Sequence, residues 1–245
     1  MDSSKMNEYE YIANKEVEEK TPSWGDFFYW LDEYYAHGEY GVIYTNKRTP
    51  YELIKVINCD ITDGDSNYDQ TEFFEENWKK NIEGLVKIYS FARCEAKSGI
   101  MNQLSDCVAK TGTNYQQVIS VLDLDVGDEL AMWTMEKAAY VGLTHPDLTK
   151  DEMIERVASA AYNIGTRTGY VLNDLKPANY GFRKDGSAFI FDFNLEESVR
   201  SIEEYRKKIT DASWEPLLTC SHKGKIGDGQ MTDINNNNTA DENEA

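Results

Sequence analysis

Residues 171–194 place four side chains with complementary chemistry at short, fixed spacings. Asp174 and Lys176 lie two residues apart. Asn179 follows Asp174 by five residues, and Asp192 follows Asn179 by thirteen. A carboxylate and an amide oxygen are hard ligands of the kind that Mg²⁺ prefers, a second carboxylate can orient a hydroxyl, and a lysine can hold a phosphate. The set favours phosphoryl transfer, in which a metal neutralises the phosphates while the acceptor is held in line.

The same segment resembles the catalytic loop and metal-binding strand of the protein-kinase superfamily. The family pattern is H-R-D-L-K-x-x-N, then a strand, then D-F-G. Residues 172–179 read LNDLKPAN and residues 192–194 read DFN, at the spacing usual in that family. A polar hairpin loop with solvated acids would explain each residue singly but not the whole pattern. The resemblance implies that ATP and Mg²⁺ are the cofactors.

The resemblance also assigns roles to these four residues. Asp174 would accept or orient the hydroxyl proton of the acceptor, and Lys176 would reach the transferring phosphate. Asn179 and Asp192 would hold the metal. Both ligands are expected at the ends of adjacent short strands, from where they can converge on one ion.

An upstream segment resembles the glycine-rich loop of the family, G-x-G-x-x-G-x-V. Residues 36–44 read AHGEYGVIY and keep the second and third glycines of that pattern as Gly38 and Gly41. Ile43 stands at the position of the family's valine. Glycines let backbone N–H groups approach phosphates closely, so these three residues are candidates for nucleotide binding.

A lysine in the centre of an apolar strand is the second upstream signal. Lys55 lies in ELIKVI, residues 52–57, which resembles the V-A-I-K strand of kinases. A buried lysine is costly unless it is paired, so Lys55 is the candidate for the α- and β-phosphates. The resemblance implies an acidic partner on the following helix, where Glu72, Glu75 and Glu76 are all available. We favour Glu75.

The expected fold class is α+β, and the resemblance implies a bilobal protein-kinase-like fold. It would combine an antiparallel N-lobe sheet with a reduced helical C-lobe. We divide the chain into a polar leader over residues 1–20, a kinase-like domain over 21–222, and a disordered tail rich in acids and Asn over 223–245. The lobes would meet near residue 135, and backbone groups of residues 135–138 would meet the adenine.

Hydrophobic periodicity gives a coarse set of elements. Helices are expected over residues 24–35, 71–81, 149–165 and 196–208, the third opened by a capping box at Thr149 and Glu152. Strands are expected within 38–57 and over 85–91, 118–125, 130–135, 170–173 and 189–191, with 118–125 and 130–135 forming a hairpin. Residues 94–116 show the least pattern and are expected to be irregular.

Several departures from the family pattern bear on the substrate. Leu172 and Asn173 replace the His and Arg of H-R-D, so switching by a phosphorylated loop is not expected, and only 53 residues follow Asp192. The economy is similar to that of RIO-type and phage-encoded kinases, and Lys176 is typical of Ser/Thr protein kinases. Protein substrates are therefore favoured.

The alternatives are a small-molecule kinase of the aminoglycoside-phosphotransferase type and a pseudokinase that binds nucleotide or a partner. Retention of Lys55, Asp174, Asn179 and Asp192 argues against the pseudokinase.

Composition excludes other classes of function. The chain has 245 residues and a net charge of −19, which disfavours binding to nucleic acid or to anionic membranes. No run of about 18 apolar residues is present, and the N-terminus has no apolar signal-peptide core. The four cysteines fit no zinc pattern and are expected to be free thiols in a reducing compartment, so a cytoplasmic location is expected. The sequence leaves the oligomeric state open.

Overall fold

A computed structural model describes residues 24–38, 41–60, 66–112, 122–196 and 200–212 of the chain. The protein is α+β, and its largest element is a five-stranded antiparallel sheet. The first part of the chain forms α2 (Trp24–Trp30), β1 (Leu31–His37), β2 (Gly41–Asn46), β3 (Thr49–Asn58), α3 (Ser66–Asn77), β4 (Ile88–Glu95), α4 (Ser98–Ala109) and β5 (Glu129–Glu136). The second part forms β6 (Tyr140–Val141), α6 (Lys150–Thr168), β7 (Val171–Asn173), the 3₁₀ turn η2 (Pro177–Asn179), β8 (Tyr180–Phe182), β9 (Ala188–Ile190), β10 (Asn194–Glu196) and α7 (Ile202–Ala212).

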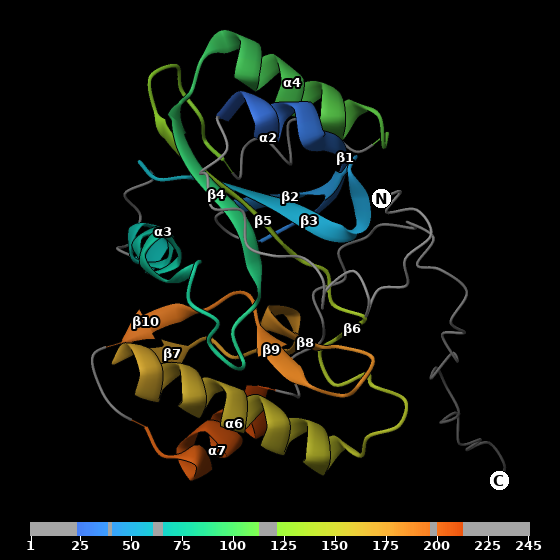
Figure 1. Ribbon diagram of the computed structural model, residues 1–245, viewed down its shortest axis with the longest axis vertical. Coiled ribbons are helices and arrows are strands. Elements are labelled where there is room, and N and C mark those ends of the chain that lie inside the picture. Colours follow the sequence, from blue (N-terminus) through green and yellow to red (C-terminus); the bar gives the residue numbers. More distant parts are fainter. Residues whose placement is uncertain (1–23, 39–40, 61–65, 113–121, 197–199, 213–245) are drawn as a thin grey trace, which may run out of the picture.

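The five-stranded sheet has the order β1-β2-β3-β5-β4, with helices on both of its faces. In Figure 1, α2 and α4 lie together over one face, and α3 lies beside the sheet. Strand β3 is buried along almost its whole length because both of its faces are covered. Register places Lys55 opposite Ile43 of β2 on one side and opposite Trp133 of β5 on the other.

The alternation of side chains along these strands divides the core into two clusters. The cluster under α2 and α4 contains Phe27, Phe28, Val42, Tyr44, Ile54, Val56, Ile100, Leu104 and Met132. The cluster on the other face contains Leu53, Ile57, Phe73, Phe74 and Trp133. The second cluster continues without a break into the interior of α6, β8 and β9. The sheet and the second part of the chain therefore share one apolar core, and Lys55 lies on the face that looks toward it.

Helices α6 and α7 pack side by side below three short β-pairings (Figure 1). The predicted capping box of α6 is confirmed: Glu152 N donates to Thr149 Oγ1 over 3.3 Å, and Thr149 N donates to Glu152 Oε2 over 2.8 Å. The hydrogen bonds that the Glu152 carboxylate accepts from the backbone N–H and the hydroxyl of Thr149 lower the pKa of that carboxyl. The helix is followed by Gly169 in a left-handed conformation, with φ of 82°.

Three sequence predictions of secondary structure are wrong: one for a helix, one for an irregular segment and one for a hairpin. The aromatic segment 24–35 is helical only to Trp30, and Leu31 begins β1, which pairs with β2. The buried residues Leu31 and Tyr34 lie three apart, a helical spacing, and the pairing of β1 with β2 accommodates this spacing through an irregularity of register between them. Residues 94–112, the described part of the segment predicted to be irregular, include the end of β4 and the whole of α4.

Apart from the hairpin, the other predicted helices and strands agree in type, with boundaries shifted by a few residues. The segments 71–81, 85–91, 149–165, 170–173, 189–191 and 196–208 correspond to α3, β4, α6, β7, β9 and α7. The predicted hairpin before β5 is not seen, because β5 pairs with β3 and β4, and residues 118–121 lie outside the described residues. The predicted leader, 1–20, and tail, 223–245, also lie outside them.

Three of the four cysteines are described, and all three are free thiols as predicted: Cys59, Cys94 and Cys107. Burial raises the pKa of Cys59 and of Cys94 to about 11. Both thiols are therefore protonated near neutral pH and poorly nucleophilic. Cys220 lies outside the described residues. No helix in the described ranges has the length and apolar character needed to cross a bilayer.

A buried ion pair joins the end of β5 to β8. The carboxylate of Glu136 is fully buried and accepts from Arg183 Nε over 2.8 Å and from Arg183 Nη2. The same carboxylate accepts the backbone N–H of Lys87 over 2.8 Å. Glu136 thus fixes the point where the chain leaves the sheet for the second part of the structure.

Replacing Arg183 with methionine is expected to destabilise the protein by about 3 kcal/mol, since it leaves the buried charge of Glu136 without its cation. Urea unfolding of the two proteins measures the difference. Arg206→Met is the matched control, because Arg206 and Glu155 form an ion pair in which both side chains are about half exposed. That pair is expected to contribute less than about 1 kcal/mol. Equal effects of the two substitutions would contradict the prediction.

Candidate functional site

The site is centred on an ion pair between residues 137 positions apart in the chain. Lys55 Nζ lies 3.0 Å from Asp192 Oδ1. The lysine comes from the middle of β3, where its side chain is only 6% exposed, and the aspartate follows β9, where a third of its side chain is exposed. The contact joins the sheet to the second part of the structure. It places the buried cation predicted from the sequence next to one of the two predicted metal ligands.

The loop after β7 holds the other predicted residues in a tight hydrogen-bonded turn. Lys176 Nζ forms an ion pair with Asp174 Oδ2 at 3.0 Å. Asn179 Nδ2 donates to the same Oδ2 over 3.0 Å and to the Asp174 carbonyl over 2.8 Å. Asp174 has a left-handed backbone, with φ of 56°, which costs a non-glycine residue about 1 kcal/mol. Strain of this kind collects at functional sites, and here the hydrogen bonds of the turn maintain it.

Backbone hydrogen bonds bring Asn179 beside Asp192. The carbonyl of Asn179 accepts from Phe191 N over 3.0 Å and from Asp192 N over 3.2 Å. These bonds arise because β8 and β9 are antiparallel, which brings the start of β8 close to the end of β9. The backbones of Asn179 and Asp192 are thus adjacent, as expected for residues at the ends of neighbouring short strands.

The donor set fits Mg²⁺. Asn179 uses its Nδ2 on Asp174, which leaves the amide oxygen Oδ1 as the atom that can bind a cation. Asp192 Oδ1 already accepts two hydrogen bonds, which leaves Oδ2 with room for a ligand. Both are hard oxygen donors. In the described part of the chain, no cluster of three or more His, Cys, Asp or Glu side chains forms a different metal site.

The predicted glycine-rich turn lies against Lys55 and Asp192. A methyl group placed on Gly38 would lie 3.7 Å from Asp192 Oδ2, and one placed on Gly41 would lie 3.3 Å from Lys55 Cε. At Gly41 it would also lie 3.1 Å from a β3 carbonyl oxygen, so this position has no room for a side chain. The turn is closed by Gly38 N donating to Gly41 O over 2.9 Å. Ile43 is half-buried opposite Lys55, and the tip of the turn, residues 39–40, lies outside the described residues.

The predicted partner of Lys55 is wrong. Glu75 is exposed and forms an ion pair with Arg93 at 2.7 Å. Glu72 and Glu76 are exposed as well. The reason is the orientation of α3. Its buried face carries Phe73 and Phe74, so its glutamates lie on the exposed face.

The helix residue that contacts Lys55 is Gln70, which sequence reasoning missed. Gln70 is 4% exposed, and its Oε1 accepts from Lys55 Nζ over 3.0 Å. Its Nε2 donates over 2.8 Å both to Asp192 Oδ1 and to the carbonyl of Phe193. The helical repeat contains a signal for it, because Gln70 lies four residues before Phe74 and three before Phe73 on the buried face.

Phe193 anchors the turn that carries Asp192 in the core. Its side chain is 2% exposed, and its ring lies edge-on to Phe73 with the centroids 5.2 Å apart. The ring of Phe74, the next residue of α3, has its centroid 5.5 Å from that of Phe193. Asn194, which follows, begins β10 and pairs with Asn173 of β7. The position of Asp192 is therefore tied both to α3 and to the strand that carries the loop of Asp174.

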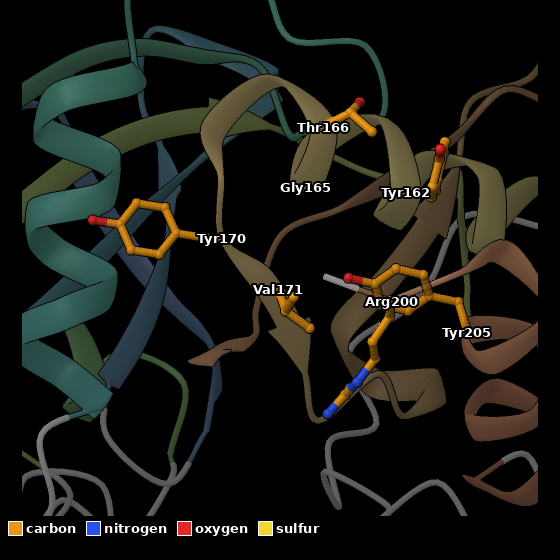
Figure 2. Close-up of a pocket in the computed structure, with 7 residues that line it drawn as sticks. All are labelled: Tyr162, Gly165, Thr166, Tyr170, Val171, Arg200 and Tyr205. Atoms are coloured by element: carbon orange, nitrogen blue, oxygen red, sulfur yellow. The ribbon is translucent and has the colours of Figure 1, made fainter. Parts of the chain in front are cut away.

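A small pocket lies beside β7, the strand that leads into the loop of Asp174, and none of the candidate residues lines it (Figure 2). Leu172 N donates to the hydroxyl of Tyr205 over 3.2 Å, and the Leu172 carbonyl accepts from Arg200 Nη1 over 3.3 Å. The pocket is lined by Tyr162, Gly165, Thr166, Tyr170, Val171, Arg200 and Tyr205. These contacts hold the strand that leads into Asp174.

The sequence matches no known family model, and no curated protein matches it.

Proposed function

We propose that this chain is an ATP- and Mg²⁺-dependent phosphotransferase with a bilobal, protein-kinase-like fold, and that it acts on Ser or Thr hydroxyls of proteins. The observation that carries the proposal is the ion pair of Lys55 with Asp192 at 3.0 Å, with Asn179 bound beside it. A buried cation next to two hard oxygen donors suits a triphosphate that carries a metal. The strand order β1-β2-β3-β5-β4 and the position of α3 beside Lys55 are consistent with the first lobe of that fold.

The residues divide the work between the nucleotide and the acceptor. Lys55 would donate to the α- and β-phosphates, and the glycine turn at Gly38 and Gly41 would admit the phosphates next to Asp192. Asp192 and Asn179 would hold Mg²⁺, which neutralises charge on the phosphates when bound. None of these groups has to form a covalent intermediate with the phosphoryl group, because catalysis of phosphoryl transfer depends mainly on positioning and charge.

Asp174 and Lys176 would act on the acceptor side. Asp174 would orient the attacking hydroxyl and accept its proton through its carboxylate. The side chain of Asp174 is 39% exposed, so an acceptor can reach it. Lys176, at 3.0 Å from that carboxylate, would follow the γ-phosphate as it moves to the acceptor. The hydrogen bonds from Asn179 hold this carboxylate close to the metal ligands.

A small-molecule acceptor is the second candidate, and one observation favours it. Only five residues separate the end of β10 at Glu196 from the start of α7 at Ile202. In the described part of the chain, α6 and α7 are the only α-helices that follow the sheet. This leaves little described surface for docking an extended peptide, whereas a small acceptor needs only the space around Asp174.

The test is transfer of γ-labelled phosphate from ATP with Mg²⁺, with and without a mixed protein extract. Label on protein is expected for the native chain and not for Asp174→Ala. Asp211→Ala, which changes an exposed carboxylate of α7, is the matched control and should retain labelling. Absence of labelling together with a thermal shift by Mg-ATP would overturn protein phosphorylation. It would favour a small-molecule kinase or a nucleotide-binding pseudokinase.

A further inference from the structure

Gln70 is the only residue of α3 in the described structure whose side chain contacts both halves of the Lys55–Asp192 pair. It accepts from Lys55 over 3.0 Å and donates to Asp192 Oδ1 over 2.8 Å. It also donates to the carbonyl of Phe193 over 2.8 Å. One buried amide thus satisfies a cation, a carboxylate and a backbone carbonyl.

Only an amide, in one orientation, fits these three partners. An amide offers two N–H donors and an acceptor oxygen. If the amide were flipped, its donors would face the ammonium group of Lys55 and its oxygen would face the Phe193 carbonyl. A glutamate would still accept from Lys55, but it has no proton for Asp192 or Phe193 and would repel the carboxylate beside it. The predicted acidic partner would therefore not perform the same task.

The amide also determines which oxygen of Asp192 is free. Oδ1 is occupied by Lys55 and Gln70, while Oδ2 lies on the side of Gly38. When Lys55 turns to phosphate, the bond from Gln70 still holds Oδ1. Oδ2 then remains aimed at the space that a metal-bound nucleotide would fill.

We propose that Gln70 is a positioning residue that orients Asp192 toward the metal of a bound nucleotide and couples α3 to it. The inference rests on the proposed nucleotide function. It predicts that Gln70 acts through Asp192, so its loss should weaken the contribution of the metal to nucleotide affinity. The affinity for ATP without metal should be almost unchanged.

The experiment is calorimetric titration of ATP into the full chain, with Mg²⁺ or with a chelator. The ratio of the two affinities is the metal enhancement. Gln70→Met keeps the length of the side chain and removes the amide, and it should lower the enhancement about tenfold, the scale on which residues that orient metal ligands act. Gln70→Glu should lower it as well. Glu76→Gln, on the exposed face of α3, is the matched control and should leave it unchanged.

A double-mutant cycle separates this role from a general effect on folding. Gln70→Met combined with Asp192→Asn should show the same enhancement as Asp192→Asn alone, because the carboxylate that Gln70 would orient toward the metal is absent in both variants. A further loss in the double variant, or full enhancement in Gln70→Met or Gln70→Glu, would overturn the role of Gln70 and leave the nucleotide function standing. If the native chain shows no metal enhancement, both proposals fall together. Melting curves confirm that each variant is folded.

Discussion

Replacing Asp192 with alanine is expected to abolish the gain in ATP affinity that Mg²⁺ provides and to lower turnover by about 10³-fold or more. The substitution removes the carboxylate that would hold the metal, and it leaves Lys55 with Gln70 as its described polar partner at this site. Turnover and calorimetric titration of ATP with and without Mg²⁺ measure the two effects.

The companion variant is Asp192→Asn. It keeps an oxygen that can accept from Lys55 and from the amide of Gln70, so it preserves the packing between β3, α3 and the turn after β9. A loss of function in both variants with a native melting curve for Asp192→Asn would assign the effect to the charge. Full turnover in a folded Asp192→Ala protein would place the reaction outside this site.

The parts of the site that could be predicted from sequence are those fixed by local spacing. The turn that holds Asp174, Lys176 and Asn179 spans six residues, so its own hydrogen bonds determine its shape. Lys55 could be predicted because a charge in an apolar strand requires a partner. Its contact with Asp192 follows from register and from the short antiparallel pair of β8 and β9.

The partner on α3 could not be predicted from residue type. The expectation of an acid led to Glu75, yet the contact is made by Gln70, a neutral residue on the buried face. Helix geometry was the better guide, because a partner of a buried lysine has to lie on the face that carries Phe73 and Phe74. Charge complementarity alone gave three candidates on the exposed face.

Helix α4, which covers one face of the sheet, could have been predicted from hydrophobic periodicity. In residues 94–116, Ile100, Leu104, Cys107 and Val108 recur at helical spacing and are all buried in α4. The polar residues between them obscured the pattern. The aromatic segment before β2 poses the opposite problem: its spacing suits a helix, yet Leu31 and Tyr34 belong to a strand whose pairing with β2 is irregular between them.

Replacing Lys55 with methionine is expected to lower turnover by about 10²- to 10³-fold while the protein stays folded. Methionine keeps an unbranched apolar side chain against Gly41 and removes the charge that would meet the phosphates. Asp192 retains its hydrogen bond from Gln70. Removing the buried ammonium group also removes its desolvation cost, so the melting temperature should change little.

Steady-state turnover and ATP affinity measure the effect of this substitution, and a melting curve measures folding. Lys207→Met, at an exposed position of α7, is the control for loss of one positive charge from a chain with a net charge of −19. It should leave both quantities unchanged. Unchanged turnover in a folded Lys55→Met protein would mean that β3 does not carry the phosphate-binding cation. The ion pair with Asp192 would then hold the two parts of the chain together without contributing to the reaction.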